Sequence, residues 1–303
     1  MSDINGKVAV VTGASRGAGK GIALALADAG AMVYVTGRTP RGGSSEDGLS
    51  GSIHATVDEI AERGGRAVAV PVDHRDDRQV ADLFATVERE HGGLDILVNN
   101  AIALPAMPDS PTQGFWERSL DSELALLDVG LRSHYVAAHF AAPLLIKNRG
   151  LLVQISSPGA RTYLPGVHGP TYGAGKAGGD KMTYDMAQEL RPHGVTVMSL
   201  WPGILATERV LANVEADPDL VGKVFPSLET PEFTGRVIAA LAADDEVIAR
   251  TGQICYGSEL GLEYGVVDVD GTSPASYRGW LGAPSSFTEV APTYGIYMAS
   301  QRG

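Results

Sequence analysis

Short apolar runs alternate with longer amphipathic segments along the 303-residue chain. Most of the short runs are continuously apolar, which is typical of strands in a parallel sheet that helices cover on both faces. They predict strands at residues 8–11, 32–36, 67–72, 95–98, 151–156, 195–200 and 253–256, and the amphipathic segments predict helices at 19–29, 53–63, 78–90, 122–147, 172–191 and 232–243. The alternation predicts an α/β fold: a single Rossmann-like, doubly wound domain with a parallel seven-stranded sheet flanked by helices on both faces.

Three segments interrupt the alternation of strands and helices. Residues 39–52 are polar and rich in glycine and serine, and we expect a flexible insertion there. Residues 207–231 follow the sixth strand and are punctuated by proline, so we expect them to form a substrate lid. Residues 265–303 are rich in glycine, serine, proline and aromatic residues, and we expect a C-terminal extension that packs on the domain or on a partner subunit. The predicted main domain therefore spans residues 1–264.

A glycine-rich turn joins the first predicted strand to the first predicted helix. The sequence Thr12-Gly-Ala-Ser-Arg-Gly-Ala-Gly19 lets the backbone approach a ligand closely, and the helix that follows offers unpaired N–H groups to a pyrophosphate. Outside this strand–turn–helix context the glycines would indicate only a turn. We expect the loop to bind a dinucleotide cofactor through Gly13, Ser15, Arg16, Gly17, Ala18 and Gly19.

Residues after the second, third and fourth strands bear on which dinucleotide binds. No acidic residue follows the second strand, where a ribose 2′-hydroxyl would be held; Arg38 stands there instead, and Arg16 lies in the glycine loop. Two guanidinium groups suit a 2′-phosphate, so NADP(H) is favoured over NAD(H), unless Arg38 is only a solvated residue at a strand end. Asp73 is expected to bind the adenine amino group or, alternatively, to cap a helix. Asn100 is expected to line the cofactor cleft, to brace the sheet, or to do both.

Tyr172 and Lys176 lie four positions apart in a predicted helix, so their side chains share one face. A tyrosine can protonate the alkoxide that forms when a hydride adds to a carbonyl, but a free phenol has a pKa of about 10. A neighbouring ammonium favours the phenolate and lowers that pKa. Ser157, with Ser156 as its competitor, closes the fifth strand and can hydrogen-bond to the same substrate oxygen. These catalytic candidates predict redox chemistry between a carbonyl and an alcohol.

The order of these motifs resembles that of the short-chain dehydrogenase/reductase family, and the resemblance covers most of the chain to about residue 260. The matching motifs are Thr12-Gly13-x3-Gly17-x-Gly19, Asn99-Asn100-Ala101, Ser157, Tyr172-x3-Lys176 and Pro202-Gly203. The resemblance implies that Ser157 orients the substrate, that Tyr172 is the acid/base, and that Lys176 binds ribose and lowers the tyrosine pKa. The cofactor contacts that it implies are Asn100, Tyr172, Lys176, Pro202, Ile204 and Thr207.

Further segments resemble one narrower type within that family, at residues 129–135, 155–159, 200–204 and 267–271. This narrower similarity reaches further towards the C-terminus. In the family, long helices form the dimer and tetramer interfaces. The predicted helices 122–147 and 172–191 have apolar faces that suit such pairing, so we expect a homodimer or homotetramer.

Two positions depart from the family pattern. Ile102 stands where the family usually has glycine after Asn-Asn-Ala, and Gly130 stands where a helix asparagine usually completes a water relay to the lysine. Glycine has no side chain to hold that water, so another water, a backbone carbonyl or His134 would have to take the place of the asparagine side chain. His134 is otherwise expected to be a helix-packing residue.

Composition and charge exclude several classes of function. A formal net charge of −12 argues against a general affinity for nucleic acid or anionic membranes. The single cysteine, Cys255, excludes an intrachain disulfide and a metal site built on several thiolates, and its apolar neighbours predict a core position. No apolar stretch reaches the length of about 20 residues that spans a bilayer, and no leader precedes the first strand, so a cytoplasmic protein is expected.

The sequence as a whole predicts an NADP(H)-dependent oxidoreductase that transfers a hydride between nicotinamide and a carbonyl or secondary alcohol, with Tyr172 as acid/base and without a metal. Two alternatives stay open. Loss of the asparagine at Gly130 would fit a non-catalytic dinucleotide-binding sensor, and the same acid/base pair would fit an enzyme without net redox chemistry. An apolar or mixed small substrate is suggested by Trp201, Leu205, Val210, Leu211, Val214 and Phe225 in and near the lid.

Overall fold

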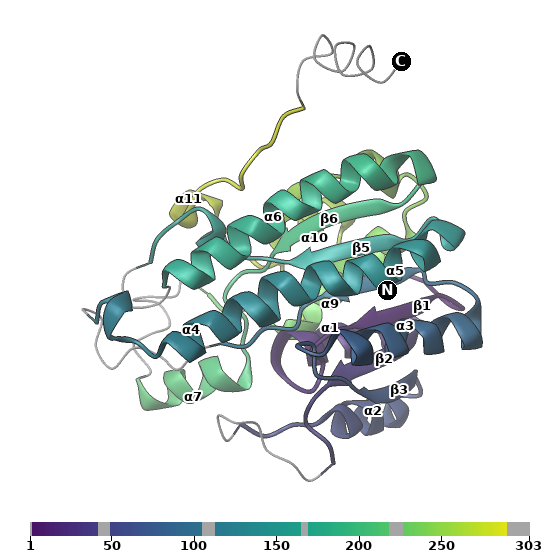
Figure 1. Cartoon of the computed structure of the whole chain (residues 1–303), viewed down its shortest axis with the longest axis horizontal. Helices are drawn as coiled ribbons and strands as arrows, with labels where there is room; N and C mark the ends of the chain where they lie inside the picture. Colours follow the sequence, from purple (N-terminus) through teal and green to yellow (C-terminus); the bar gives the residue numbers. More distant parts are fainter. Residues whose placement is uncertain (1, 42–48, 105–112, 165–168, 218–226, 290–303) are drawn as a thin grey trace.

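Seven parallel strands form one sheet in the order β3-β2-β1-β4-β5-β6-β7 (Figure 1). The computed structural model describes residues 2–41, 49–104, 113–164, 169–217 and 227–289. The strands are β1 Val8–Val11, β2 Met32–Gly37, β3 Arg66–Pro71, β4 Ile96–Asn99, β5 Leu151–Ile155, β6 Thr196–Trp201 and β7 Ile254–Tyr256. The sheet confirms the predicted parallel, doubly wound architecture.

Helices cover both faces of this sheet. They are α1 Gly17–Asp28, α2 Ile53–Glu62, α3 Asp77–His91, α4 Leu120–Leu127, α5 Ser133–Asn148, α6 Pro170–Leu190, α7 Glu208–Ala216, α9 Pro231–Ala243, α10 Gly257–Tyr264 and α11 Arg278–Leu281. Alternate strand residues point to opposite faces. Ala9 and Val11 of β1 belong to the core beneath α1, α2, α9 and α10, whereas Val8 and Val10 belong to the core beneath α3, α5 and α6.

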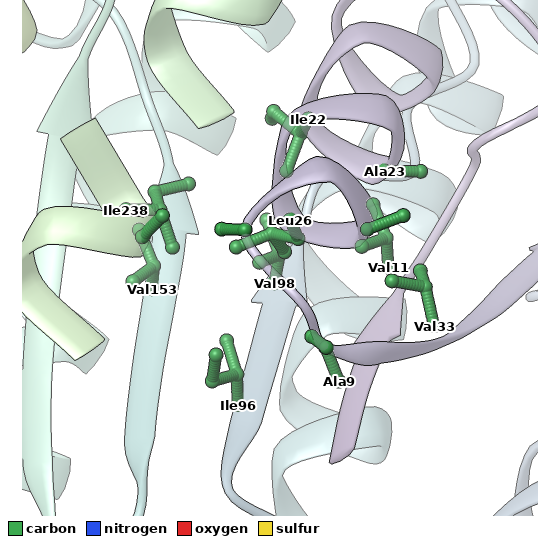
Figure 2. Close-up of a cluster of buried hydrophobic side chains, with 14 of the residues drawn as sticks. Ala9, Val11, Ile22, Ala23, Leu26, Val33, Ile96, Val98, Val153 and Ile238 are labelled. Carbon is green, nitrogen blue, oxygen red and sulfur yellow. The ribbon is translucent and has the colours of Figure 1, made fainter. Parts of the chain in front are cut away.

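The core beneath α1 and α9 is close-packed. Figure 2 shows Ile22 and Leu26 of α1 and Ile238 of α9 above Val98 and Val153 of the central strands. Glycines let the two helices approach each other. A Cβ on Gly235 of α9 would lie 2.7 Å from Ala25 Cβ and 2.8 Å from Ile22 Cα, both in α1. The contact therefore leaves no room for a methyl group at this position.

One predicted helix, 122–147, is wrong because the structure divides it. Between α4 and α5 lies the π-helical segment η2 Asp128–Arg132, in which Gly130 has φ 145° and ψ −20°. The backbone of Val129 leaves the helix as well, and its carbonyl oxygen accepts a hydrogen bond of 2.9 Å from Ala103 N. A positive φ of this size is open to glycine and strained for other residues. The apolar pattern continues across the break and therefore did not reveal it.

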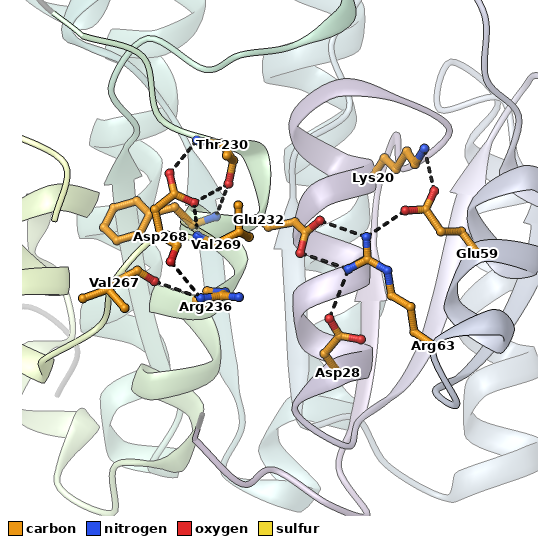
Figure 3. Close-up of polar contacts among 11 residues, drawn as sticks. Lys20, Asp28, Glu59, Arg63, Thr230, Glu232, Arg236, Val267, Asp268 and Val269 are labelled. Atoms are coloured by element: carbon orange, nitrogen blue, oxygen red, sulfur yellow. Dashed lines mark hydrogen bonds and ion pairs between the residues drawn. The ribbon is translucent and has the colours of Figure 1, made fainter. Parts of the chain in front are cut away.

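The described part of the C-terminal extension packs on its own domain. Asp268 accepts a hydrogen bond of 2.8 Å from Thr230 N at the start of α9, and Arg236 Nη1 donates to the carbonyl oxygens of Val267 and Asp268, each at 3.1 Å (Figure 3). Further along, Tyr277 and Leu281 are buried with Trp201 and Tyr256. Figure 3 also shows Arg63 with Asp28, Glu59 and Glu232, an ion-pair network that links α2 to α1 and α9.

Parts of the three interrupting segments lie outside the described residues. These parts are 42–48 of the expected insertion, 218–226 of the expected lid, and 290–303 of the extension. Phe225, named above as a lid residue, is among them. The described part of the lid contains α7, which the sequence pattern did not predict.

Replacing Gly235 with alanine tests the close packing of α1 and α9. The added methyl group has to push the helices apart, and overpacking of this kind costs about 1–3 kcal/mol, more than the gain of about 0.5–1 kcal/mol in helix propensity. We expect a lower urea midpoint for the variant. Gly257→Ala in α10 is the control, because its added Cβ would find its nearest atom at 3.8 Å. A Gly235→Ala protein as stable as wild type would contradict the close packing.

Candidate active site

A cavity of ≈ 820 Å³ opens where the carboxyl ends of the strands meet. It brings together all of the candidate catalytic and cofactor-binding residues that the sequence suggested. The lining includes Gly13, Ser15, Arg16, Gly17, Ala18, Gly19, Arg38, Asp73, Asn100, Ser157, Tyr172, Lys176, Pro202, Ile204 and Thr207. These residues follow six different strands, and the parallel sheet places them at one edge.

Helix α6 presents Tyr172 and Lys176 to the end of β5. The Tyr172 hydroxyl donates a hydrogen bond of 3.0 Å to Ser157 Oγ. Lys176 is only 7% exposed, and its Nζ donates to the carbonyl oxygen of Ile155 at 2.9 Å. The same Nζ lies 5.7 Å from the centroid of the Tyr172 ring. Ser157, Tyr172 and Lys176 thus lie side by side at the cavity wall.

The two serines after β5 have different partners. Ser157 Oγ accepts hydrogen bonds from Tyr172 and, at 3.0 Å, from Gly159 N. Ser156 is buried, and its Oγ donates to the backbone carbonyl oxygen of Lys176 at 3.3 Å. Both line the cavity, but the bond to Tyr172 favours Ser157 as the serine that acts with the tyrosine.

Burial favours the neutral forms of both titratable groups. It raises the pKa of the Tyr172 phenol, and the hydrogen bond with Ser157 opposes this rise. It lowers the pKa of Lys176 to about 8, and the negative charge of Asp180 opposes this fall. Near neutral pH the pair is a protonated phenol beside an ammonium, which is the state that can donate a proton to an alkoxide.

Hydrogen bonds tie the glycine loop to the loop after β4. Asn100 Nδ2 donates to the carbonyl oxygens of Thr12 at 2.8 Å and Gly13 at 3.1 Å, while Thr12 Oγ1 accepts from Asn100 N at 2.8 Å. A Cβ on Gly19 would lie 2.3 Å from Gly13 O, so this turn admits only glycine there. Asn100 therefore braces the loop and also lines the cavity.

A carboxylate from α7 reaches the start of α1. Gly17 N donates a hydrogen bond of 2.9 Å to Glu208 Oε2. The sequence predicted that α1 would begin at Gly19, but it begins at Gly17. The Gly17 N–H is therefore one of the first-turn donors that have no partner within the helix. Glu208 thus lies where an anionic ligand of the loop would bind. The sequence held no local signal for it, since its partner is 191 positions away.

Arg16 links the two ends of the polar insertion by hydrogen bonds. Its guanidinium donates to Thr39 Oγ1 at 3.2 Å on one side and to the carbonyl oxygens of Ser50 at 3.0 Å and Gly51 at 2.6 Å on the other. Arg38 lines the same end of the cavity. Asp73, which also lines it, accepts a hydrogen bond of 2.9 Å from Arg75 Nη2.

The two departures from the family pattern are in contact with each other. A Cβ on Gly130 would lie 3.3 Å from Ile102 Cγ1. Next to them His134 is buried, with Nε2 2.7 Å from Ala101 O and Nδ1 bonded to Gln154 Nε2. Burial, aided by the charge of Lys176, lowers the pKa of His134 to about 3, so the imidazole is neutral. This agrees with a packing role for His134.

Part of the cavity lining is apolar. Leu164, Leu205, Val210, Trp280 and Leu281 form this part, and the last two come from α11 in the C-terminal extension. The sequence pattern did not predict α11, because a helix of four residues carries no periodic signal. Trp201, named with the lid residues, is instead fully buried against Tyr256, so that part of the prediction is wrong.

Within the described residues there is no group of three or more His, Cys, Asp or Glu side chains suited to a metal ion, and no helix long and apolar enough to cross a membrane. Cys255 is partly exposed, so the predicted core position is only partly right; burial nevertheless raises the pKa of its thiol to about 11.

Comparison with known proteins agrees with this geometry. Residues 7–218 match a family model described as short chain dehydrogenase. Dehydrogenase/reductase SDR family member 1 from Homo sapiens is 40% identical over 284 residues, which cover 90% of this chain and 87% of that protein. The mouse protein of the same name is 39% identical over 287 residues, covering 91% and 88%. These similarities confirm the narrower type that the sequence suggested.

Solved structures share the fold. One, described as a dehydrogenase from Xanthomonas campestris, aligns with a TM-score of 0.73 at 27% identity, covering 89% of this chain and 94% of that one. Another, described as an NAD(P)-dependent gluconate 5-dehydrogenase from Beutenbergia cavernae with bound NADP at low occupancy, gives 0.70 at 29% identity, covering 84% and 96%. The chain therefore belongs to the short-chain dehydrogenase/reductase family of NAD(P)-dependent oxidoreductases.

Proposed function

We propose that the protein is an NADP(H)-dependent oxidoreductase that transfers a hydride between nicotinamide and a carbonyl or secondary alcohol, with Tyr172 as the acid/base. One observation carries the proposal: the Tyr172 hydroxyl bonds to Ser157 at 3.0 Å, with Lys176 Nζ 5.7 Å from its ring centroid, in the cavity that the glycine loop also lines. A proton donor, an orienting hydroxyl and a fixed positive charge are the groups that carbonyl reduction requires.

A nicotinamide cofactor held in this cavity would supply the hydride in reduction and accept it in oxidation. In reduction, Tyr172 gives its phenolic proton to the carbonyl oxygen while the new C–H bond forms at the carbonyl carbon. Ser157 donates a hydrogen bond to the same substrate oxygen. In this structure Tyr172 donates to Ser157 Oγ; with substrate bound, the carbonyl oxygen would accept from Tyr172 instead. Lys176 stabilises the phenolate that remains, because an ammonium nearby opposes the effect of burial on the phenol pKa.

The lining of the cavity fits a dinucleotide. The narrow turn at Gly19 and the first turn of α1 suit a pyrophosphate, held by the loop residues Gly13, Ser15, Arg16, Gly17 and Ala18. Asp73 and Asn100 would contact the adenosine side and the cleft, and Pro202, Ile204 and Thr207 the nicotinamide side. Arg38, with Arg16, supports NADP(H) over NAD(H), since no carboxylate follows β2 to hold a ribose hydroxyl.

The remaining parts of the proposal concern the substrate and the assembly. The apolar wall formed by Leu164, Leu205, Val210 and Trp280 suits an apolar carbonyl compound.

The exposed faces of α4, α5 and α6 support a homodimer or homotetramer; Tyr135 on α5, for example, is 54% exposed. A single cysteine is compatible with a reducing, cytoplasmic compartment.

Gly130 is the observation that favours a second candidate, a dinucleotide-binding sensor. Its φ of 145° would be strained for asparagine, and a Cβ at this position would lie 3.3 Å from Ile102 Cγ1, so the backbone here is not arranged for the asparagine of the usual relay. Tight cofactor binding without turnover on any carbonyl or alcohol would support the sensor. Product formation without a net change in cofactor absorbance would instead point to non-redox chemistry by the same acid/base pair.

Replacing Tyr172 with phenylalanine tests the acid/base. The ring stays above Lys176 while the proton donor is lost, so we expect NADPH oxidation with a panel of ketones and aldehydes to fall by about 10²–10⁴-fold. Cofactor affinity should change little. Tyr184→Phe is the matched control, since Tyr184 is on the same helix outside the cavity lining. Equal activity in wild type and Tyr172→Phe would remove the proposed acid/base.

Replacing Arg38 with alanine tests the cofactor preference. A hydrogen bond to a charged group contributes about 1.5–3 kcal/mol, so we expect NADP(H) to bind about 10- to 100-fold more weakly by calorimetry, with NAD(H) affinity unchanged. Arg89→Ala is the control, because it removes the same charge on α3, where Arg89 pairs with Glu90 away from the cavity lining. It should change neither the NADP(H) affinity nor the NAD(H) affinity. Tighter binding of NAD(H) than of NADP(H) by wild type would overturn the preference.

Replacing Glu208 with glutamine tests the carboxylate at the start of α1. An anion at a helix N-terminus contributes about 0.3–1 kcal/mol, so its loss should tighten NADP(H) binding about two- to fivefold and slightly lower the melting temperature of the ligand-free protein. Glu215→Gln, an exposed position of the same helix, is the control. Weaker cofactor binding by Glu208→Gln would show that the carboxylate helps to hold the cofactor.

A further inference from the structure

A buried carboxylate, Asp180, lies on α6 one helical turn beyond Lys176. It has no exposed surface, and it is absent from the cavity lining. Tyr172, Lys176 and Asp180 follow one another at intervals of four, so they share one face of the helix. The proposed chemistry uses the first two and leaves the third without a role.

Asp180 is hydrogen-bonded by donors from β6, and Ser156, which follows β5 and lines the cavity, is a further hydrogen-bond partner. Ser199 Oγ donates to Oδ1 at 2.6 Å, and Trp201 Nε1 donates to Oδ2 at 3.0 Å. Donors directed at both oxygens are what an ionised carboxylate needs, and they offset part of the cost of burying it. Burial still raises the pKa of Asp180, and these hydrogen bonds and the charge of Lys176 oppose the rise.

Asp180 also connects α6 with the strand end next to the cavity. Trp201 is the last residue of β6 and immediately precedes Pro202 and Gly203, which line the cavity. Its indole ring packs edge-on against Tyr256, with 5.4 Å between ring centroids. The bond from Nε1 to Asp180 therefore fixes the start of the Pro202–Gly203 turn against the helix that carries Tyr172 and Lys176.

The two positions that depart from the family pattern, and the histidine beside them, supply no negative charge to Lys176. Gly130 has no side chain, Ile102 is apolar, and His134 is neutral. The Nζ of Lys176 donates to the carbonyl oxygen of Ile155, a dipole rather than a charge. Asp180 is the carboxylate whose charge acts on Lys176 to hold its pKa up.

We propose that Asp180 is a positioning residue that keeps Lys176 in its ammonium form and holds the end of β6 against α6. The proposal rests on the proposed roles of Tyr172 and Lys176 for its effect on catalysis. Its effect on the charge of Lys176 does not depend on catalysis, and the two effects are measured separately below.

Asp180→Asn keeps the size of the side chain and removes its charge. In the ligand-free protein we expect the pH at which Lys176 becomes half-maximally reactive towards an amine-acylating reagent to fall by about one unit, measured by mass spectrometry of the Lys176 peptide. Removing a negative charge lowers the pKa of Lys176 and of Tyr172 alike. The alkaline limit of NADPH-dependent carbonyl reduction should therefore move to lower pH too, with a lower kcat and an unchanged KM for the carbonyl.

Asp185→Asn is the matched control, because Asp185 is on the same helix but exposed and paired with Lys181. It should leave both pH profiles unchanged. Should Asp180→Asn not fold, Ser199→Ala removes the 2.6 Å hydrogen bond and raises the pKa of Asp180, so the acylation profile of Lys176 should move the same way by a smaller amount. A lower rate without any shift in the acylation profile would make Asp180 merely structural and overturn the proposal.

The two readouts separate the possible failures. If wild type reduces no carbonyl but Asp180→Asn still shifts the acylation profile, the proposed function fails and the assignment of Asp180 to the charge of Lys176 stands. If wild type reduces carbonyls and Asp180→Asn leaves the acylation profile in place, the assignment of Asp180 fails alone.

Discussion

A buried ammonium is the constraint on which the geometry of the active site depends. Moving such a charge out of water costs several kcal/mol even after the protein relaxes, so Lys176 requires fixed partners. Its Nζ is held by the carbonyl oxygen of Ile155 at the end of β5, and this contact joins α6 to the sheet. Ser157 follows Ile155 by two residues and Tyr172 precedes Lys176 by one helical turn. The bond that solvates the ammonium therefore also sets the distance between the phenol and the serine hydroxyl.

The same constraint explains why the departures at Ile102 and Gly130 form a compatible pair. A Cβ on residue 130 would lie only 3.3 Å from Ile102 Cγ1, so the isoleucine side chain fits best beside a glycine. Glycine at 130 also permits the positive φ with which the chain leaves α4 and enters α5. Neither Gly130 nor Ile102 carries a charge, and His134, on which the charge of Lys176 acts, is neutral, so none of the three balances the ammonium.

Local patterns predicted the fold and most of the candidate site, and distant contacts account for what they missed. Continuous apolar runs located the strands because both faces of a parallel sheet are buried, and the glycine loop was readable because a strand and a helix flank it. Once the strands are parallel and in this order, the residues that follow them meet at one edge, which is why Asn100, Ser157 and Pro202 were found together. Glu208 and Trp280 carry no such signal, because each reaches the cavity only through the tertiary fold. The break at Gly130 was missed for a different reason, since an uninterrupted apolar stripe also runs through a kinked helix.

The contact between Glu208 and Gly17 links α7 to the glycine loop. A carboxylate and a pyrophosphate need the same N–H donors at the start of α1, so only one of them can be bound there at a time. The carboxylate gains about 0.3–1 kcal/mol from the helix dipole, which is small beside the binding energy of a whole dinucleotide. A pyrophosphate bound to these donors would break this contact between α7 and the loop, whereas Thr207, whose side chain caps the first turn of α7 and lines the cavity, would stay in place. The cost of breaking the contact would be subtracted from the affinity for any dinucleotide, so it would weaken NADP(H) and NAD(H) alike and would not contribute to a preference between them.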